Sequence, residues 1–157
     1  MLINGLTYGY YKDLVYKFLL YPEAWQVYIF GKDMEALKIL ADIAIEIGGD
    51  LICSKNKGEK YIQLISKTGG QLRLFYNRQV DNMCGQRAHT VIADDLYSLK
   101  DFEEYFYPLA NLSMWDVNYF NSDEVKECFK KDFEKDKKIN IFYKDWKESL
   151  NENNKSD

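Results

Sequence analysis

The sequence predicts an α/β fold, a small three-layer structure with at least one parallel pair of strands and a β hairpin. Three observations lead to this prediction. Helical and strand-like patterns alternate in the first part of the chain, two short strands flank a glycine turn, and a later strand is apolar without alternation. Such an order favours a sheet of parallel neighbours covered by helices.

Two amphipathic helices are expected early in the chain. Apolar residues recur at helical spacing over 8–20, and Thr7 is positioned to cap that helix. The same spacing recurs over 34–47, where Asp33 is the expected cap and a glycine pair ends the pattern. Both segments are therefore predicted to lie on a sheet with one apolar face.

Short runs rich in β-branched and aromatic residues predict the strands. They are expected at 26–30, 51–53, 61–65, 72–76 and 89–93. The turn Lys67-Thr68-Gly69-Gly70 joins the third and fourth of these runs into a hairpin. The last run is apolar without alternation, as in a strand that is buried on both faces.

The second half of the chain is predicted to be mostly helical. One helix is expected over 101–107, ended by Pro108, and another over 122–134, with its first serine or aspartate as cap. Residues 139–143 fit either a last strand or an extended arm.

Length and composition indicate one soluble domain. With 157 residues, of which 46% are hydrophobic and 29% charged, the chain is expected to fold as a single domain over 1–150, followed by a disordered polar tail over 151–157. No run of 18 apolar residues predicts a membrane span. Three isolated cysteines fit reduced thiols, which favours a cytoplasmic protein.

An acidic pair follows the apolar strand. Val91-Ile92-Ala93 leads directly into Asp94 and Asp95, which places two carboxylates at the carboxyl edge of the predicted sheet. They are the candidate catalytic residues and the candidate ligands of a Mg²⁺ ion. Two other roles stay open for them: capping the helix that follows, or serving as nuclease carboxylates.

Basic residues gather in the middle of the chain, although the net charge of the whole chain is −4. Between residues 51 and 93, seven basic side chains stand against two acidic ones. The seven are Lys55, Lys57, Lys60, Lys67, Arg73, Arg78 and Arg87. They form the candidate nucleic-acid site, with a solvated hairpin as the alternative.

These motifs resemble the ATPase domain of the large terminase subunits that pump DNA into viral capsids. Asp81-Asn82-Met83-Cys84-Gly85-Gln86-Arg87-Ala88 is similar to the family's Asp-x-x-Arg-Gly-x-Arg-Ala segment, and the acidic strand follows it. The strand Gly70–Phe75 resembles the family's Gly-Ser-x-Ile-x-Phe strand. The resemblance covers about residues 5–95 and implies a P-loop fold.

The chain departs from this family at the phosphate loop. That loop needs Gly-x-x-x-x-Gly-Lys-Ser/Thr, whereas the segment Asn4–Lys12 has its glycines four apart and its lysine three positions after the second glycine. In Gly31-Lys32-Asp33 an aspartate replaces the hydroxyl residue, and Cys84 stands where the family has an arginine. The resemblance therefore implies a degenerate P-loop fold, in which ATP with Mg²⁺ would bind only if a partner chain supplied the phosphate loop.

Three functions are consistent with these observations. The first is a viral or mobile-element protein that binds nucleic acid, or a DNA-packaging or replication partner, without hydrolysing ATP by itself. The second is a protein-binding inhibitor of a host enzyme or defence system, acting through the acidic, aromatic residues 96–157. The third is a Mg²⁺-dependent ATPase or nuclease that a partner chain completes.

Overall fold

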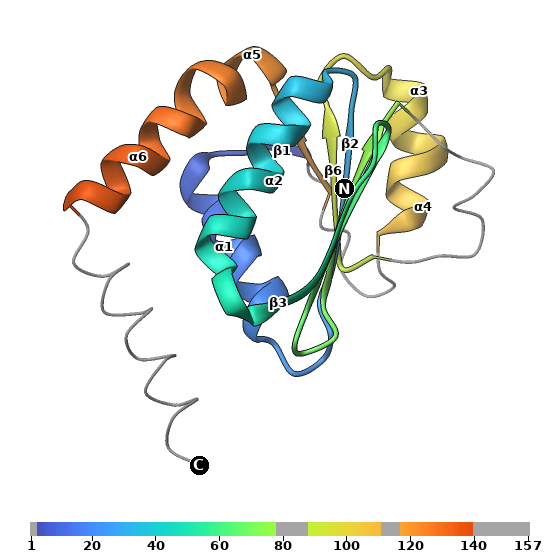
Figure 1. Ribbon diagram of the computed structural model, residues 1–157. Helices are drawn as coiled ribbons and strands as arrows, with labels where there is room; N and C mark the ends of the chain where they lie inside the picture. The colour runs from blue at the N-terminus through green and yellow to red at the C-terminus, as the bar shows by residue number, and fades with distance from the viewer. Residues whose placement is uncertain (1–2, 78–87, 111–116, 140–157) are drawn as a thin grey trace.

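The computed structural model describes residues 3–77, 88–110 and 117–139 (Figure 1). Within these residues one sheet of seven strands runs in the order β1-β7-β6-β2-β5-β4-β3. The strands are β1 (Ile3–Gly5), β2 (Gln26–Gly31), β3 (Ile52–Lys57), β4 (Tyr61–Ser66), β5 (Gln71–Tyr76), β6 (Thr90–Asp94) and β7 (Val117–Phe120). The five neighbouring strands β1, β7, β6, β2 and β5 are parallel to one another. Strands β4 and β3 continue the sheet in antiparallel pairs, β5 with β4 and β4 with β3.

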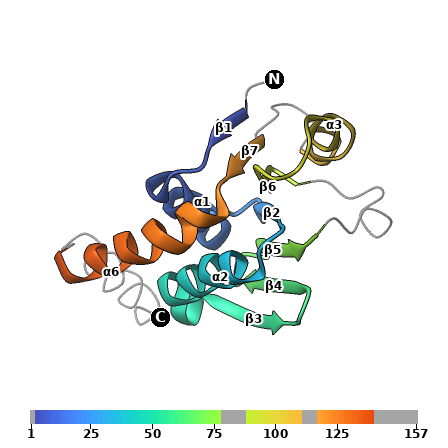
Figure 2. The ribbon, with the colours of Figure 1, turned by 90° about the horizontal axis from the view of Figure 1, so that it is seen from above.

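Helices cover both faces of the sheet, as Figure 2 shows from above. The helical segments are α1 (Tyr8–Leu20), α2 (Met34–Gly48), η1 (Gly49–Leu51), α3 (Leu99–Asp101), η3 (Phe102–Phe106), α4 (Tyr107–Leu109), α5 (Ser122–Glu124), η4 (Val125–Phe129) and α6 (Lys130–Ile139). The segments α3, η3 and α4 follow one another without a break, and so do α5, η4 and α6. The predicted α/β class, the parallel pairs and the hairpin β4–β5 are thus confirmed.

The first two helices begin where their caps predict. The Thr7 hydroxyl accepts a hydrogen bond from the Tyr10 amide at 3.2 Å, and the Asp33 carboxylate accepts bonds from the first turn of α2. Helix α2 ends at Gly49, whose φ of 52° lies in the left-handed region that glycine adopts without strain.

Two strands were not predicted. Strands β1 and β7 have three and four residues, which is too short for a periodic pattern, and they pair with each other in parallel at one side of the sheet. The prediction of a strand or extended arm over 139–143 is wrong for its first residue, because Ile139 is the last residue of helix α6. Residues 140–143 and the predicted tail 151–157 lie outside the described part of the chain.

Pro108 does not end its helix, in contrast to the prediction. The helix begins at Leu99 and continues through Pro108 to Leu109. The preceding turn is π-helical: the Tyr107 amide donates to the Phe102 carbonyl, five residues earlier. In this wider turn, hydrogen bonds join residues five apart instead of four. The helix therefore has an altered hydrogen-bond pattern where it meets Pro108, which has no amide hydrogen to donate.

Two apolar clusters fill the space on either side of the sheet. The larger joins the sheet to α1, α2 and η4–α6, and the smaller joins it to α3–α4. In the larger cluster the buried Tyr11 hydroxyl donates to the Leu40 carbonyl at 2.5 Å, which ties α1 to α2. Burial raises the pKa of this phenol above its ordinary value. Helices packed on both faces hold the strands in place, and with them the edge of the sheet at which the parallel strands end.

Candidate functional site at the carboxyl edge of the sheet

Five parallel strands end at the same edge of the sheet, and all of them except β1 are followed by a polar residue. Strand β2 leads into α2 on one face, whereas its neighbour β6 leads into α3 on the other face. In open α/β sheets, ligands bind where neighbouring strands diverge in this way. The space between the ends of β2 and β6 is therefore the candidate site, and the predicted Asp94 and Asp95 lie there.

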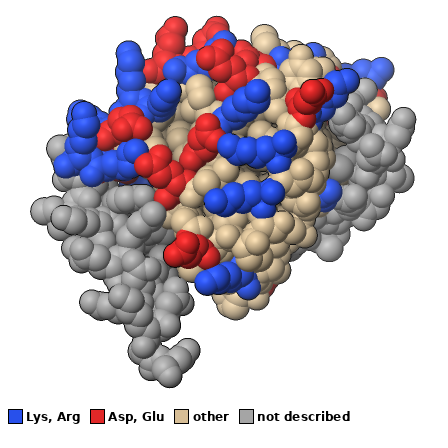
Figure 3. Space-filling model, in the orientation of Figure 1, with Lys and Arg blue, Asp and Glu red and all other residues tan. Residues whose placement is uncertain are grey.

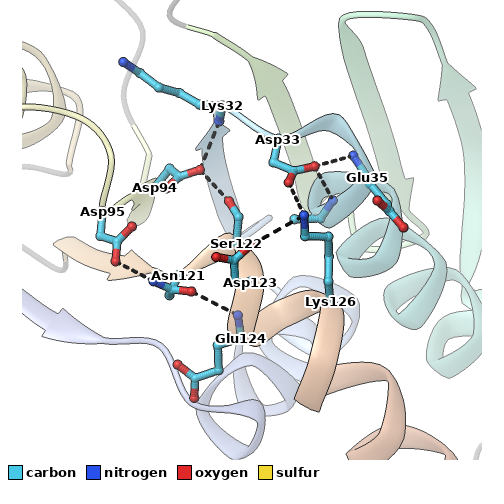
Figure 4. A network of polar contacts seen from close by, with 11 residues as sticks. Lys32, Asp33, Glu35, Asp94, Asp95, Asn121, Ser122, Asp123, Glu124 and Lys126 are labelled. Carbon is cyan, nitrogen blue, oxygen red and sulfur yellow. Dashed lines mark hydrogen bonds and ion pairs between the residues drawn. The ribbon is translucent and has the colours of Figure 1, made fainter.

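Asp94 is the centre of a hydrogen-bond network that joins three strand ends (Figure 4). Its carboxylate is fully buried, with 0% exposure. One oxygen accepts the Leu96 amide at 3.1 Å. The other accepts the Lys32 amide at 3.1 Å and the Ser122 hydroxyl at 2.6 Å. Three donors compensate the desolvation of the charge, so this side chain links the end of β6 to the segments that follow β2 and β7.

Asp95 has a different environment. Its side chain is exposed and accepts one hydrogen bond, from the Asn121 side-chain amide at 2.9 Å. The Asn121 side-chain oxygen in turn accepts the Glu124 amide at 3.0 Å, which makes Asn121 the cap of α5. The expected serine or aspartate cap of this helix is therefore wrong, and Ser122 instead bonds to Asp94.

At the same edge of the sheet, an ion pair joins the beginning of α2 to η4. The Lys126 ammonium of η4 lies 2.6 Å from the Asp33 carboxylate and 3.6 Å from the Asp123 carboxylate. The hydrogen bond from Lys126 is the main reason that the pKa of Asp33 is below its ordinary value, and Asp33 in turn raises the pKa of Lys126. Asp33 thus caps α2 and holds η4 beside it.

The segment with the degenerate phosphate-loop pattern forms a tight connection. Only Leu6 and Thr7 separate β1 from α1, and Leu6 is buried. Gly9 and Lys12 belong to α1, and the Lys12 ammonium forms an ion pair with Asp136 at 3.1 Å. A phosphate loop needs several consecutive free amides and a free lysine. Here Thr7 accepts one amide of the first turn, and Asp136 holds the lysine.

The metal-binding capacity of this edge is small. Among the described residues, no group of three or more His, Cys, Asp and Glu side chains is placed to hold a metal ion. Both oxygens of Asp94 already accept hydrogen bonds from the chain, so Asp95 is the more accessible of the two predicted Mg²⁺ ligands. Oxygen ligands of this kind would suit Mg²⁺, which keeps several of its waters.

The predicted nucleic-acid residues of the hairpin are distributed over different surfaces. Lys55 and Lys57 pair with Leu64 and Ile62, and so point to the face that carries α2, where Lys57 forms an ion pair with Asp42. Lys60 and Lys67 lie beyond opposite ends of β4, about 20 Å apart at ordinary strand rise. These four side chains do not form one patch.

Arg73 lies on the other face of the sheet, among aromatic rings. Its guanidinium donates to the Tyr61 hydroxyl at 2.7 Å and to the Tyr28 hydroxyl at 3.2 Å. It also lies over the rings of Tyr28, Tyr61 and Phe75. The hydrogen bonds to the two tyrosines raise the pKa of this guanidinium against the opposing effect of its burial. Arg78 and Arg87 lie outside the described residues, as does Cys84.

His89 precedes β6 and makes two contacts with residues at and just before the start of β2. Its Nδ1 atom accepts the Gln26 amide at 3.0 Å, and its ring stacks on Trp25 with 4.2 Å between centroids. Burial lowers the pKa of this imidazole, against a smaller effect of Glu23. The neutral ring joins the beginning of β2 to the beginning of β6, at the opposite edge from Asp94.

Several aromatic side chains of the C-terminal third are part of the core. Phe106, Tyr107 and Phe120 are buried, and Trp115 lies outside the described residues. The exposed apolar side chains near the acidic pair are instead Leu96 and Leu99, each 65% exposed.

Sequence reasoning missed two partners of Asp94, namely Lys32 and Ser122. Their signal was positional: Lys32 is the first residue after β2, and Ser122 is the second residue after β7. Only the order of the strands shows that these ends are adjacent, and β7 was not predicted.

In the part of the chain that the structure describes, no helix combines the length and the apolar character that a membrane crossing requires. Comparisons of the chain with protein-family models, with curated proteins and with solved structures give no match.

Proposed function

We propose that this protein is a viral or mobile-element protein with a degenerate terminase-like ATPase fold, which binds nucleic acid or a DNA-packaging or replication partner without hydrolysing ATP by itself. The main support is the state of Asp94, which is the residue that the resemblance equates with a magnesium ligand. It is fully buried and accepts three hydrogen bonds from its own chain. A carboxylate engaged in this way holds strand ends together and has little capacity left for a metal ion.

The position of the acidic strand supports the proposed ancestry. Strand β7 lies between β1 and β6, and all three are parallel. The β1–α1 connection and Asp94 therefore face the same edge of the sheet, as a phosphate loop and an acidic strand must if both are to contact one nucleotide. The two-residue length of that connection supports the absence of independent hydrolysis.

Calorimetric titration with ATP and Mg²⁺ tests the non-hydrolysing part of this proposal. We expect no binding heat and no release of phosphate from the isolated chain. Saturable binding of Mg²⁺–ATP that is lost on Asp94→Asn, with no loss of stability, would refute it and favour the third function, an ATPase or nuclease completed by a partner.

A second function is favoured by one separate observation. Leu96 and Leu99 are highly exposed beside the carboxylate of Asp95, a combination of apolar and acidic groups that a protein partner could cover. This fits an inhibitor of a host enzyme or defence system that acts through residues 96–157. A complex with one host protein should then be lost on Leu96→Ser with Leu99→Ser and should be weakened by Asp95→Asn. If the complex is unaffected by the two leucine changes, this function is excluded.

A further inference from the structure

One face of α6 carries a set of exposed lysines that no described residue neutralises. We define the lysine stripe as Lys130, Lys131, Lys135 and Lys138, all of which are exposed. No ion pair to another described residue engages these four side chains. The stripe was absent from the sequence-based candidates, since the local charge of this segment is mixed.

The packing of α6 directs the stripe outward. Phe129 and Phe133 are one turn apart and are 2% and 3% exposed, and Phe129 contacts the rings of Tyr8 and Tyr11. At about 100° per residue, Lys131, Lys135 and Lys138 lie on the side of the helix roughly opposite these phenylalanines, and Lys130 lies on the flank between the two sides. Figure 3 shows basic side chains projecting from this region, interspersed with acidic ones.

Two of the acidic side chains of α6 are engaged in ion pairs with other lysines. Asp136 pairs with Lys12, and Glu134 pairs with Lys137, which also pairs with Glu46. The stripe borders an open groove of about 510 Å³, together with Lys126 and Glu134. Five lysines and one carboxylate therefore line a groove on a protein whose net charge is −4.

We propose that the lysine stripe is the surface that binds nucleic acid, through the phosphates of one backbone strand. This deepens the proposed function and rests on it. Lys130 and Lys138 are eight residues apart, or about 12 Å along the helix. Over the same length of duplex axis one strand presents three to four phosphates, at about 3.4 Å of axis per phosphate. Four ammonium groups thus match the charge of the backbone that they would face.

A duplex is favoured over a membrane surface by the same packing. A helix that binds a bilayer inserts its apolar face into it, and here that face is buried against α1. An acidic polypeptide would be the other polyanion, and the test below includes it. The hairpin lysines offer no comparable set, because Lys57 is already paired with Asp42 and because Lys60 and Lys67 lie beyond opposite ends of β4.

The experiment measures the affinity of the full chain for a short labelled duplex at several salt concentrations. The test variant changes Lys130, Lys131, Lys135 and Lys138 to glutamine. The matched control changes Lys55, Lys57, Lys60 and Lys67 to glutamine, with the same loss of charge. A third variant replaces the stripe lysines by arginine, which keeps the charge.

We expect the stripe variant to lose at least roughly tenfold in affinity at about 50 mM salt, and its slope of log K against log salt to become shallower by about 3 to 4. The hairpin control and the arginine variant should keep most of the affinity.

An equal loss of affinity in the stripe and hairpin variants, or a loss in the hairpin variant alone, would overturn the assignment of the lysine stripe as the binding surface but leave nucleic-acid binding intact. Equal affinity of the wild type for poly-glutamate also overturns it. If the wild-type chain binds no duplex at low salt, the proposed function itself fails.

Discussion

The carboxyl edge of the sheet and the lysine stripe of α6 are both rich in charge, but they differ in how that charge is satisfied. At the edge, Asp94 is buried and accepts three hydrogen bonds from its own chain, and Asp33 is paired with Lys126. On α6, the four lysines are exposed and have no ion-pair partner among the described residues. The first region therefore contributes to stability, and the second is available to a ligand.

This difference reverses what motif similarity alone suggests. The acidic strand end carries the resemblance to a nucleotide site, yet its central carboxylate is occupied by internal donors. Lysines that belong to no motif present the larger uncompensated charge. For this reason we place the proposed binding surface on charge that the fold does not use internally.

The largest expected effect comes from removing the central carboxylate of the edge. Asp94→Ala leaves two part-buried amides and the buried Ser122 hydroxyl without their acceptor, so the free energy of unfolding should fall by about 3–5 kcal/mol. Urea unfolding followed by circular dichroism measures this. Asp95→Ala is the matched control; because that side chain is exposed, we expect a loss of less than about 1 kcal/mol. Equal losses would contradict the structural role of Asp94.

A smaller effect is expected at the cap of α2. Asp33→Ala removes the acceptor for the first turn and should cost about 1–2 kcal/mol of stability. Asp33→Asn keeps a capping oxygen but loses the charge that Lys126 contacts, so it should be the milder change. Thermal unfolding of the two variants separates the cap from the ion pair. A larger loss for asparagine than for alanine would exclude capping as the main role.

The opposite edge should respond to acid through His89. Burial lowers the pKa of its imidazole in the folded state, so below the ordinary histidine value of about 6.5 the unfolded chain binds more protons. This contribution to stability is therefore present at neutral pH and is lost as the pH falls below that value. In His89→Asn an amide oxygen can accept the Gln26 amide without titrating. Urea unfolding at several pH values should show a weaker pH dependence for this variant, and an unchanged dependence would refute the assignment.

The smallest effect on stability is expected from the lysine stripe itself. The four lysines are exposed and unpaired among the described residues, so their replacement by glutamine should change the free energy of unfolding by no more than about 0.5 kcal/mol per site. Thermal unfolding of the quadruple glutamine variant measures it. A large loss would show that these lysines have internal partners and would remove the contrast with the carboxyl edge.

The sequence predicted the elements that have strong local signals. Helices α1 and α2 begin at their predicted caps, and the hairpin forms at its glycine turn. The predicted helix 101–107 was too short, because the π-helical turn before Pro108 depends on hydrogen bonding that composition does not show. Strands β1 and β7 were missed because they are too short to show alternation.

The candidate site could likewise be predicted only where its signal is local in the sequence. A strand ending in Asp94 and Asp95 could be read from the sequence, and so could its position at the carboxyl edge. The donors from Lys32 and Ser122 could not, since they depend on β2 and β7 flanking β6. The hairpin lysines are close in sequence but separate in space: Lys55 and Lys57 share the face that carries α2, whereas Lys60 and Lys67 lie beyond opposite ends of β4.

The central claim is that Asp94 holds the fold together while nucleic acid binds elsewhere. It is tested most directly by the duplex affinity of wild type and Asp94→Asn, measured with Mg²⁺ and with EDTA at a temperature at which both chains are folded. We predict the same affinity for both chains and no dependence on Mg²⁺. Binding that requires Mg²⁺ and disappears in Asp94→Asn would contradict the account.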